Sequence, residues 1–107
     1  MSLTSTTIHL KSLSFQSTSF IFNEPLSVVA TMLESADAAL VTLELDSEQI
    51  VMLPVSGESL DAALNMLAHS FYVSWASARE NCEHDEMAAL ALAVIEECCL
   101  VTTSSLN

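Results

Sequence analysis

The chain has 107 residues, of which 51% are hydrophobic and 15% charged, so it has the size and composition of one domain with its own core. Fourteen Asp and Glu residues against only Lys11 and Arg79 give a formal net charge of -12 at pH 7. This balance disfavours direct binding to nucleic acid or to an anionic membrane surface, because both depend on basic residues. It favours a basic protein surface as the partner.

Three further features suggest a soluble cytoplasmic protein. The longest apolar run, residues 87–95, is much shorter than the roughly 20 residues of a membrane-spanning helix. Residues 1–7 contain no basic segment ahead of an apolar stretch, as a secretory signal would require. The three cysteines include the neighbours Cys98 and Cys99, which are poorly placed for an ordinary disulfide, so we expect reduced thiols.

The first half of the chain predicts a hairpin followed by a short helix. Residues 7–15 and 19–22 are rich in Thr, Ile, Leu and Phe and form the hairpin, with a bulge near Lys11 and Ser12 where the two-residue period breaks. Asn23 then caps a helix that begins near Pro25. The apolar stripe of that helix comprises Leu26, Val29, Met32, Leu33 and Ala36.

The second half predicts another hairpin and two helices. Residues 41–45 and 50–55 form the hairpin, with its turn at 46–49. A long helix begins at Ser59, and its apolar stripe comprises Leu60, Ala63, Leu64, Leu67, Phe71, Ser74, Trp75 and Ala78. After a polar break at 80–86, a final helix is apolar on every side from Met87 to Ile95, so we expect it to be buried inside the domain or against another molecule.

The predicted fold is therefore α+β over residues 1–107, in the order ββαββαα. Its antiparallel sheet of about four strands carries the helices on one face. A homodimer formed through Met87 to Ile95 is one way to bury the last helix.

Residues that could form a metal or catalytic centre are present, but their spacing is unfavourable. Cys82, His84, Cys98 and Cys99 are zinc-binding types, yet Cys98 and Cys99 would point about 100° apart on a helix. An acidic environment raises the pKa of a thiol, which argues against Cys82 as a nucleophile activated by His84 and Asp85. We expect no metal, no cofactor and no catalytic site, and hence no enzyme. A small enzyme or ligand-binding protein, with a site assembled from His69, Tyr72, Trp75 and Cys82, stays open as an alternative.

Two acidic clusters are the predicted partner-binding residues. The first comprises Glu44, Asp46 and Glu48, and the second comprises Glu80, Glu83, Asp85 and Glu86. On a strand, carboxylates two residues apart would be separated by about 6.6 Å, roughly the spacing of every second phosphate along a nucleic-acid strand. Such a surface could occupy the basic nucleic-acid groove of another protein, although the same acids could serve only to keep an apolar domain soluble.

These observations favour a non-enzymatic inhibitor or adaptor that occludes a basic surface of a nucleic-acid-handling or host-defence protein. In general character the chain is similar to phage-encoded anti-defence proteins, such as anti-CRISPR and DNA-mimic inhibitors, a similarity of type that carries no residue roles. A dimeric acidic chaperone for an effector-like client is the alternative, because the chain resembles bacterial secretion chaperones in size and acidity. An obligate dimer with an exposed apolar groove would favour the chaperone, and a monomer with a continuous acidic face the inhibitor.

Overall fold

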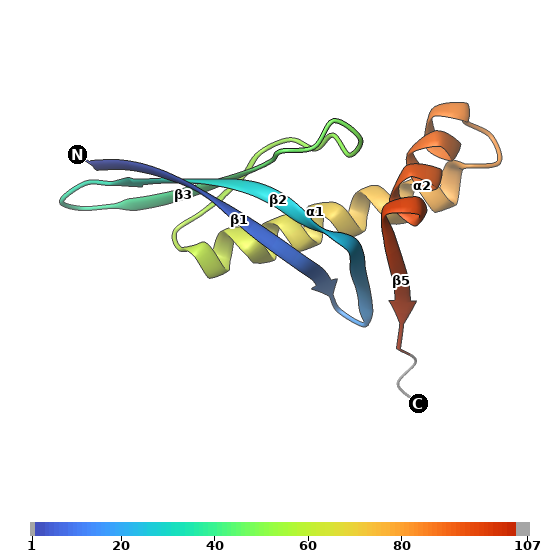
Figure 1. Ribbon diagram of the computed structural model, residues 1–107, viewed down its shortest axis with the longest axis horizontal. Helices are drawn as coiled ribbons and strands as arrows, with labels where there is room; N and C mark the ends of the chain where they lie inside the picture. Colours follow the sequence, from blue (N-terminus) through green and yellow to red (C-terminus); the bar gives the residue numbers. More distant parts are fainter. Residues whose placement is uncertain (1, 105–107) are drawn as a thin grey trace.

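A computed structural model describes residues 2–104 and shows an α+β fold. The elements follow in the order β1 (Ser2–Phe15), β2 (Thr18–Glu34), β3 (Ala39–Leu45), β4 (Val55–Gly57), α1 (Leu60–Asn81), α2 (Glu86–Cys98) and β5 (Cys99–Thr103). Figure 1 shows that the turn between β2 and β3 lies at one end of the molecule, and α2 and β5 lie at the other. The predicted class, an antiparallel sheet with helices, is confirmed, but the order of elements is ββββααβ.

The sheet is built around the long strand β2. All its pairings are antiparallel: β1 pairs with β2 along most of its length, β3 pairs with the second half of β2, and β5 pairs with the first half. The short strand β4 pairs only with β3. The register of β1 and β2 shifts between Leu10 and Ser12, which confirms the predicted bulge.

The helix predicted from Pro25 is wrong, because these residues continue β2 as far as Glu34. Leu26, Val28 and Ala30 are buried and alternate with more exposed residues, which is the two-residue period of a strand. Leu26, Val29, Met32 and Leu33 also fit the period of a helix, which is why the sequence predicts one here. The segment is nevertheless a strand, because β1 and β3 lie on either side of it and pair with its backbone. Asn23 caps no helix, and its side chain donates a hydrogen bond of 2.8 Å to the Glu97 carbonyl.

The second hairpin is shorter than predicted. Its first strand is confirmed as β3, whereas the predicted partner strand at 50–55 is reduced to β4, and residues 51–54 form no strand. The Ser47 hydroxyl accepts hydrogen bonds from the backbone of Gln49 and Ile50, at 3.2 and 3.1 Å, and so turns the chain away from β3. Ile50 is then buried, while Val51 is 86% exposed.

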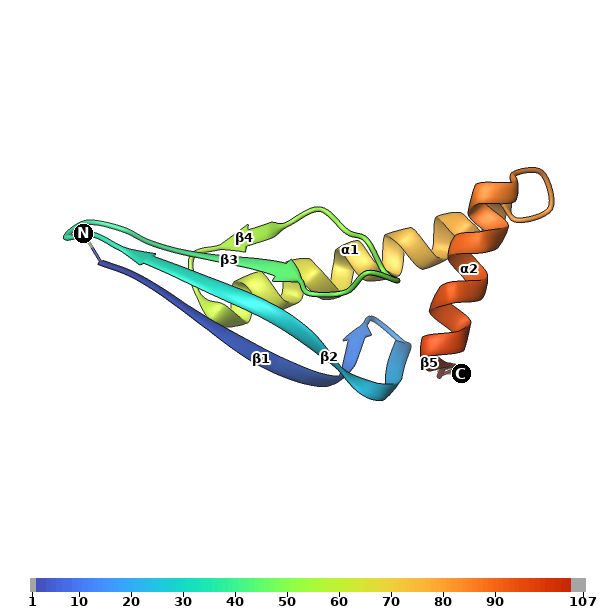
Figure 2. The same ribbon diagram turned by 45° about the horizontal axis from the view of Figure 1, so that its top comes forward.

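Helix α1 forms as predicted and covers one face of the sheet (Figure 2). The Ser59 hydroxyl caps it by accepting a hydrogen bond of 3.1 Å from the backbone of Ala62. Its buried residues lie on the predicted stripe, except for the additional Ala68, and are Ala63, Leu67, Ala68, Phe71, Trp75 and Ala78.

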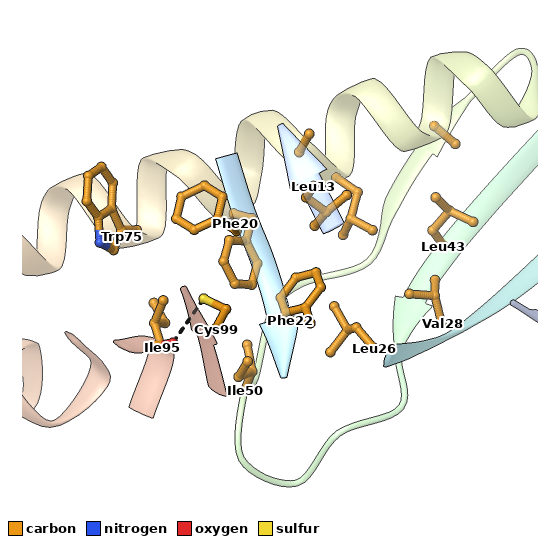
Figure 3. Packing of buried hydrophobic residues seen from close by; sticks show 14 of the residues in the cluster. Leu13, Phe20, Phe22, Leu26, Val28, Leu43, Ile50, Trp75, Ile95 and Cys99 are labelled. Atoms are coloured by element: carbon orange, nitrogen blue, oxygen red, sulfur yellow. Dashed lines mark hydrogen bonds between the residues drawn. The ribbon is translucent and has the colours of Figure 1, made fainter. Parts of the chain in front are cut away.

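The core lies between α1 and the sheet (Figure 3). Phe20 of β2 meets Phe71 of α1 edge to face, with ring centroids 4.8 Å apart, and it meets Trp75 in the same geometry at 5.5 Å. Leu43 and Val28 contribute fully buried aliphatic side chains from β3 and β2. From Ser2 to Ser104, neither helix combines the length and apolarity needed to cross a bilayer.

Helix α2 is the main departure from the expected burial. Asp85 caps it by accepting a hydrogen bond of 2.9 Å from the backbone of Met87. Ile95 is its only buried residue, whereas Met87 and Leu90 are 72% and 60% exposed. Within one chain, the helix that was expected to be largely buried therefore leaves an apolar face open.

Candidate functional site

An apolar cavity of about 390 Å³ lies where residues 50–52 approach α1 and α2. We call it the apolar groove. Met87, Leu90, Ala91 and Val94 of α2 line it, together with Val51 and Met52 of the loop. Among the described residues that line it, only Gln49 and Ser74 are polar, while Phe71 and Ile95 connect it to the hydrophobic core.

The apolar side chains at the rim of the apolar groove are unusually exposed to solvent. Val51, Met87 and Leu90 are 86%, 72% and 60% exposed. Isolated exposed apolar residues are ordinary, but a contiguous set around a cavity is typical of a binding surface. Because the loop and the helix bring these residues together from positions almost forty apart in the sequence, only the fold assembles the groove.

A second cavity, also of about 390 Å³, has a different chemical character. We call it the acidic hollow, because Glu24 of β2, Asp46 of the loop after β3 and Glu97 of α2 all line it. The remaining lining includes Asn23 and Ser27. Two hydrogen bonds tie its walls together: one joins Asn23 to the Glu97 carbonyl at 2.8 Å, and the other joins the Asp46 amide to the Ser27 carbonyl at 3.0 Å.

The two cavities are adjacent, because Gln49 and Ile50 line both. Ile50 is buried, and it lies near Phe22, Ile95 and Cys99 in Figure 3. The Cys98 thiol donates to the Gln49 side-chain oxygen at 3.3 Å and so links the loop to the end of α2. One short loop segment therefore separates an apolar surface from a carboxylate-lined one.

All seven predicted partner-binding residues are exposed: Glu44, Asp46, Glu48, Glu80, Glu83, Asp85 and Glu86. The two predicted clusters do not merge into one acidic surface along α2, because Asp46 of the first cluster and Glu86 of the second lie near opposite ends of this helix. Asp46 lines the acidic hollow with Glu97, near the end of α2, whereas Glu86 opens the same helix. At 1.5 Å of rise per residue, Glu86 and Glu97 are about 16 Å apart along the helix.

The predicted strand spacing of the first cluster is wrong beyond Glu44. Strand β3 ends at Leu45, and the turn at Ser47 redirects the chain before Glu48. Because Asp46 and Glu48 lie beyond the end of β3, the three carboxylates do not follow the even spacing of one strand, and among them only Asp46 lines the acidic hollow.

Sequence reasoning missed Glu24 and Glu97 as members of a site. Neither residue belongs to the two predicted acidic clusters. They are brought together only by the contact between β2 and the end of α2, which includes the Asn23 hydrogen bond. No local sequence pattern indicates a contact over that separation.

Three of the four residues considered for an enzyme site, His69, Tyr72 and Trp75, pack with Phe15 in an aromatic cluster, whereas the Cys82 thiol donates a hydrogen bond to the Arg79 carbonyl. Phe15 lies 4.8 Å from the His69 ring and 5.1 Å from the Tyr72 ring, and Tyr72 lies 5.9 Å from Trp75. The Arg79 guanidinium lies over Trp75 at 4.9 Å, a cation–π contact. None of His69, Tyr72, Trp75 and Cys82 lines either the apolar groove or the acidic hollow.

The three cysteines are free, and their environments differ. Among residues 2–104, no three His, Cys, Asp or Glu side chains are grouped closely enough to hold a metal ion. Burial, followed by the neighbouring Cys98 and Glu96, raises the pKa of the Cys99 thiol from 9.0 to about 11. That thiol donates a hydrogen bond of 3.0 Å to the Ile95 carbonyl, drawn in Figure 3, so it is held in its protonated, unreactive form.

No protein-family model, curated protein sequence or solved structure matches this chain.

Proposed function

We propose that this protein is a non-enzymatic interaction module that binds and occludes a basic surface of another protein. The target class that suits such a surface best is a nucleic-acid-handling or host-defence protein, which would make the chain an inhibitor or adaptor of the anti-defence type. The observation that supports the proposal is that every one of the fourteen carboxylate side chains is exposed.

The physical basis is long-range attraction followed by short-range pairing. Exposed carboxylates with only Lys11 and Arg79 to offset them produce a strongly negative field around the whole molecule. Such a field accelerates encounter with a basic patch, and Arg or Lys pairs at the contact then fix the orientation. Both effects weaken as salt rises.

The test is capture of partners from a lysate of the natural host by the tagged chain, at about 0.05 M and about 0.5 M salt, with identification by mass spectrometry. We expect a basic partner that is released at the higher salt. Added duplex DNA should displace the same partner, because nucleic acid and the acidic chain would compete for one basic surface. A partner that is indifferent to both salt and DNA would contradict the proposal.

The exposed apolar groove specifically favours one second candidate, an acidic chaperone that shields an apolar client segment. Light scattering on the purified chain separates the two. An obligate dimer that binds an unfolded client at high salt would favour the chaperone, and a monomer that loses its partner at high salt would favour the inhibitor.

A further inference from the structure

We propose that the apolar groove and the acidic hollow form one docking site for an amphipathic helix of a partner protein, whose apolar residues are flanked by Lys or Arg. The inference rests on the proposed function and specifies the part of the basic partner that is recognised. It depends on three features: the open apolar groove, the position of the acids relative to that groove, and the net charge of the chain.

One wall of the apolar groove is long enough to contact two turns of a bound helix. Its α2 wall runs from Met87 to Val94, about 10 Å of helix, which corresponds to two turns of a bound helix. The exposed side chains of Val51, Met87 and Leu90 would lose contact with water when apolar residues of the partner fill the cavity.

Carboxylates lie at both ends of this wall. The acidic hollow adjoins the groove through Gln49 and Ile50 and contains Glu97, near the end of α2. At the other end, Glu83, Asp85 and Glu86 are all exposed and directly precede Met87 in the chain. A helix lying along α2 would therefore meet carboxylates beyond each end of its apolar face, which favours Lys or Arg at both positions.

The charge of the chain argues against a second copy as the occupant. Two copies that met through this groove would bring together two molecules of net charge -12, with acids at both ends of each contact. That repulsion opposes the homodimer through Met87 to Ile95, whereas a basic helix gains both the apolar contact and the attraction.

Peptide binding tests the inference directly. The probe is a helical peptide of about 18 residues, long enough to retain some helix alone, with Leu on one face and Lys toward both ends. One control replaces the Leu residues by Ser, and a second replaces the Lys residues by Glu. We expect the Leu–Lys peptide to bind at low salt, and each control to bind at least about tenfold more weakly.

Two pairs of protein variants locate the binding site. Ala91 and Ala93 are both exposed on α2, but only Ala91 lines the apolar groove. Ala91→Gln should weaken the affinity for the Leu–Lys peptide about tenfold, whereas the matched Ala93→Gln should change this affinity by less than about twofold.

The second pair matches charge. One triple variant neutralises the acidic hollow by Glu24→Gln, Asp46→Asn and Glu97→Gln. The control triple variant neutralises Glu34, Asp37 and Glu58 in the same way. We expect the first variant to bind the Leu–Lys peptide about fivefold more weakly than the control variant does. Those three control acids are exposed and do not line the hollow. Circular dichroism confirms that each variant is folded before its affinity is compared.

The outcomes separate the two proposals. Equal binding of the Leu–Lys and Ser–Lys peptides would overturn the docking site and leave the acidic module standing. Equal binding of the Leu–Lys and Leu–Glu peptides would overturn both proposals, because charge would then play no part. Self-association that Ala91→Gln abolishes, with no peptide bound, would identify a second copy as the occupant and overturn the docking inference.

Discussion

At the scale of single residues, Gly57 shows how closely the sheet and α1 approach. A Cβ atom at this position would lie 2.6 Å from the Ala63 nitrogen and 2.9 Å from the Ala62 carbonyl carbon, and both are backbone atoms that cannot rotate away. We expect Gly57→Ala to lower the free energy of unfolding by about 1–3 kcal/mol, because α1 must shift from β4. Chemical denaturation measures this difference in free energy of unfolding. A difference below a few tenths of a kcal/mol would show that β4 and α1 leave room for a methyl group at position 57.

Cys99 provides a prediction on pH. Because its pKa is raised from 9.0 in the unfolded chain to about 11 in the folded one, the neutral thiol stabilises the fold at pH values below 9.0. This contribution is lost as pH rises from 9.0 through about 11. We expect the unfolding free energy of the native chain to fall over that range more steeply than that of Cys99→Ala, and identical slopes would contradict the burial of this thiol.

At the scale of elements, β2 shows where a local pattern of apolar residues is not enough to distinguish a strand from a helix. Leu26, Val29, Met32 and Leu33 fit a helical stripe, while Leu26, Val28 and Ala30 fit a strand, and an apolar segment satisfies both periods. Pairing with β1 and β3 decides between them, and that pairing is not visible in the sequence of the segment itself. By contrast, the single long stripe and the Ser59 cap made α1 predictable, because its apolar period is unambiguous.

The candidate site combines residues that a local sequence pattern indicates with residues that only long-range contacts bring together. The apolar run from Met87 to Ile95, which supplies one wall of the groove, is visible in the sequence, and so is the clustering of the acids at 80–86, whose role in binding stays a prediction. The turn around Ser47 was predicted, but Val51 and Met52 were assigned to a strand, because nothing in their sequence indicates that the chain leaves β3 after this turn and buries Ile50 beside α2. The contribution of Glu24 and Glu97 depends on long-range contacts and was not predictable from spacing.

Asp85, the N-cap residue of α2, allows its capping role to be tested separately from its predicted role in binding. Asp85 caps the helix and also belongs to the predicted acidic surface. Asp85→Ala should lower the free energy of unfolding by about 1 kcal/mol, because the cap is lost, whereas Asp85→Asn retains a capping oxygen and should cost little. Thermal denaturation compares the two variants.

The two Asp85 variants should differ in stability but agree in binding. If the charge of Asp85 contributes to recognition, both should weaken binding of the basic partner to a similar extent. Weakened binding in Asp85→Ala alone would instead assign the residue a purely structural role.

At the scale of the whole molecule, the net charge of -12 is spread over exposed carboxylates, so the folded chain repels itself. Salt screens this repulsion, and we expect the thermal midpoint to rise between about 0.02 M and about 0.2 M salt. Calorimetry in sodium chloride measures the change. A midpoint that falls over this range would mean that attractive ion pairs, rather than repulsion, dominate the electrostatics of the fold.

The proposed site of recognition is the apolar groove together with the acidic hollow, at the α2 end of the molecule. Hydrogen exchange of the chain, alone and with the captured partner, tests it most directly. We predict that protection on binding is concentrated in residues 46–53 and in α2. Protection confined to the turn between β2 and β3, at the opposite end of the molecule in Figure 1, would contradict this site of recognition.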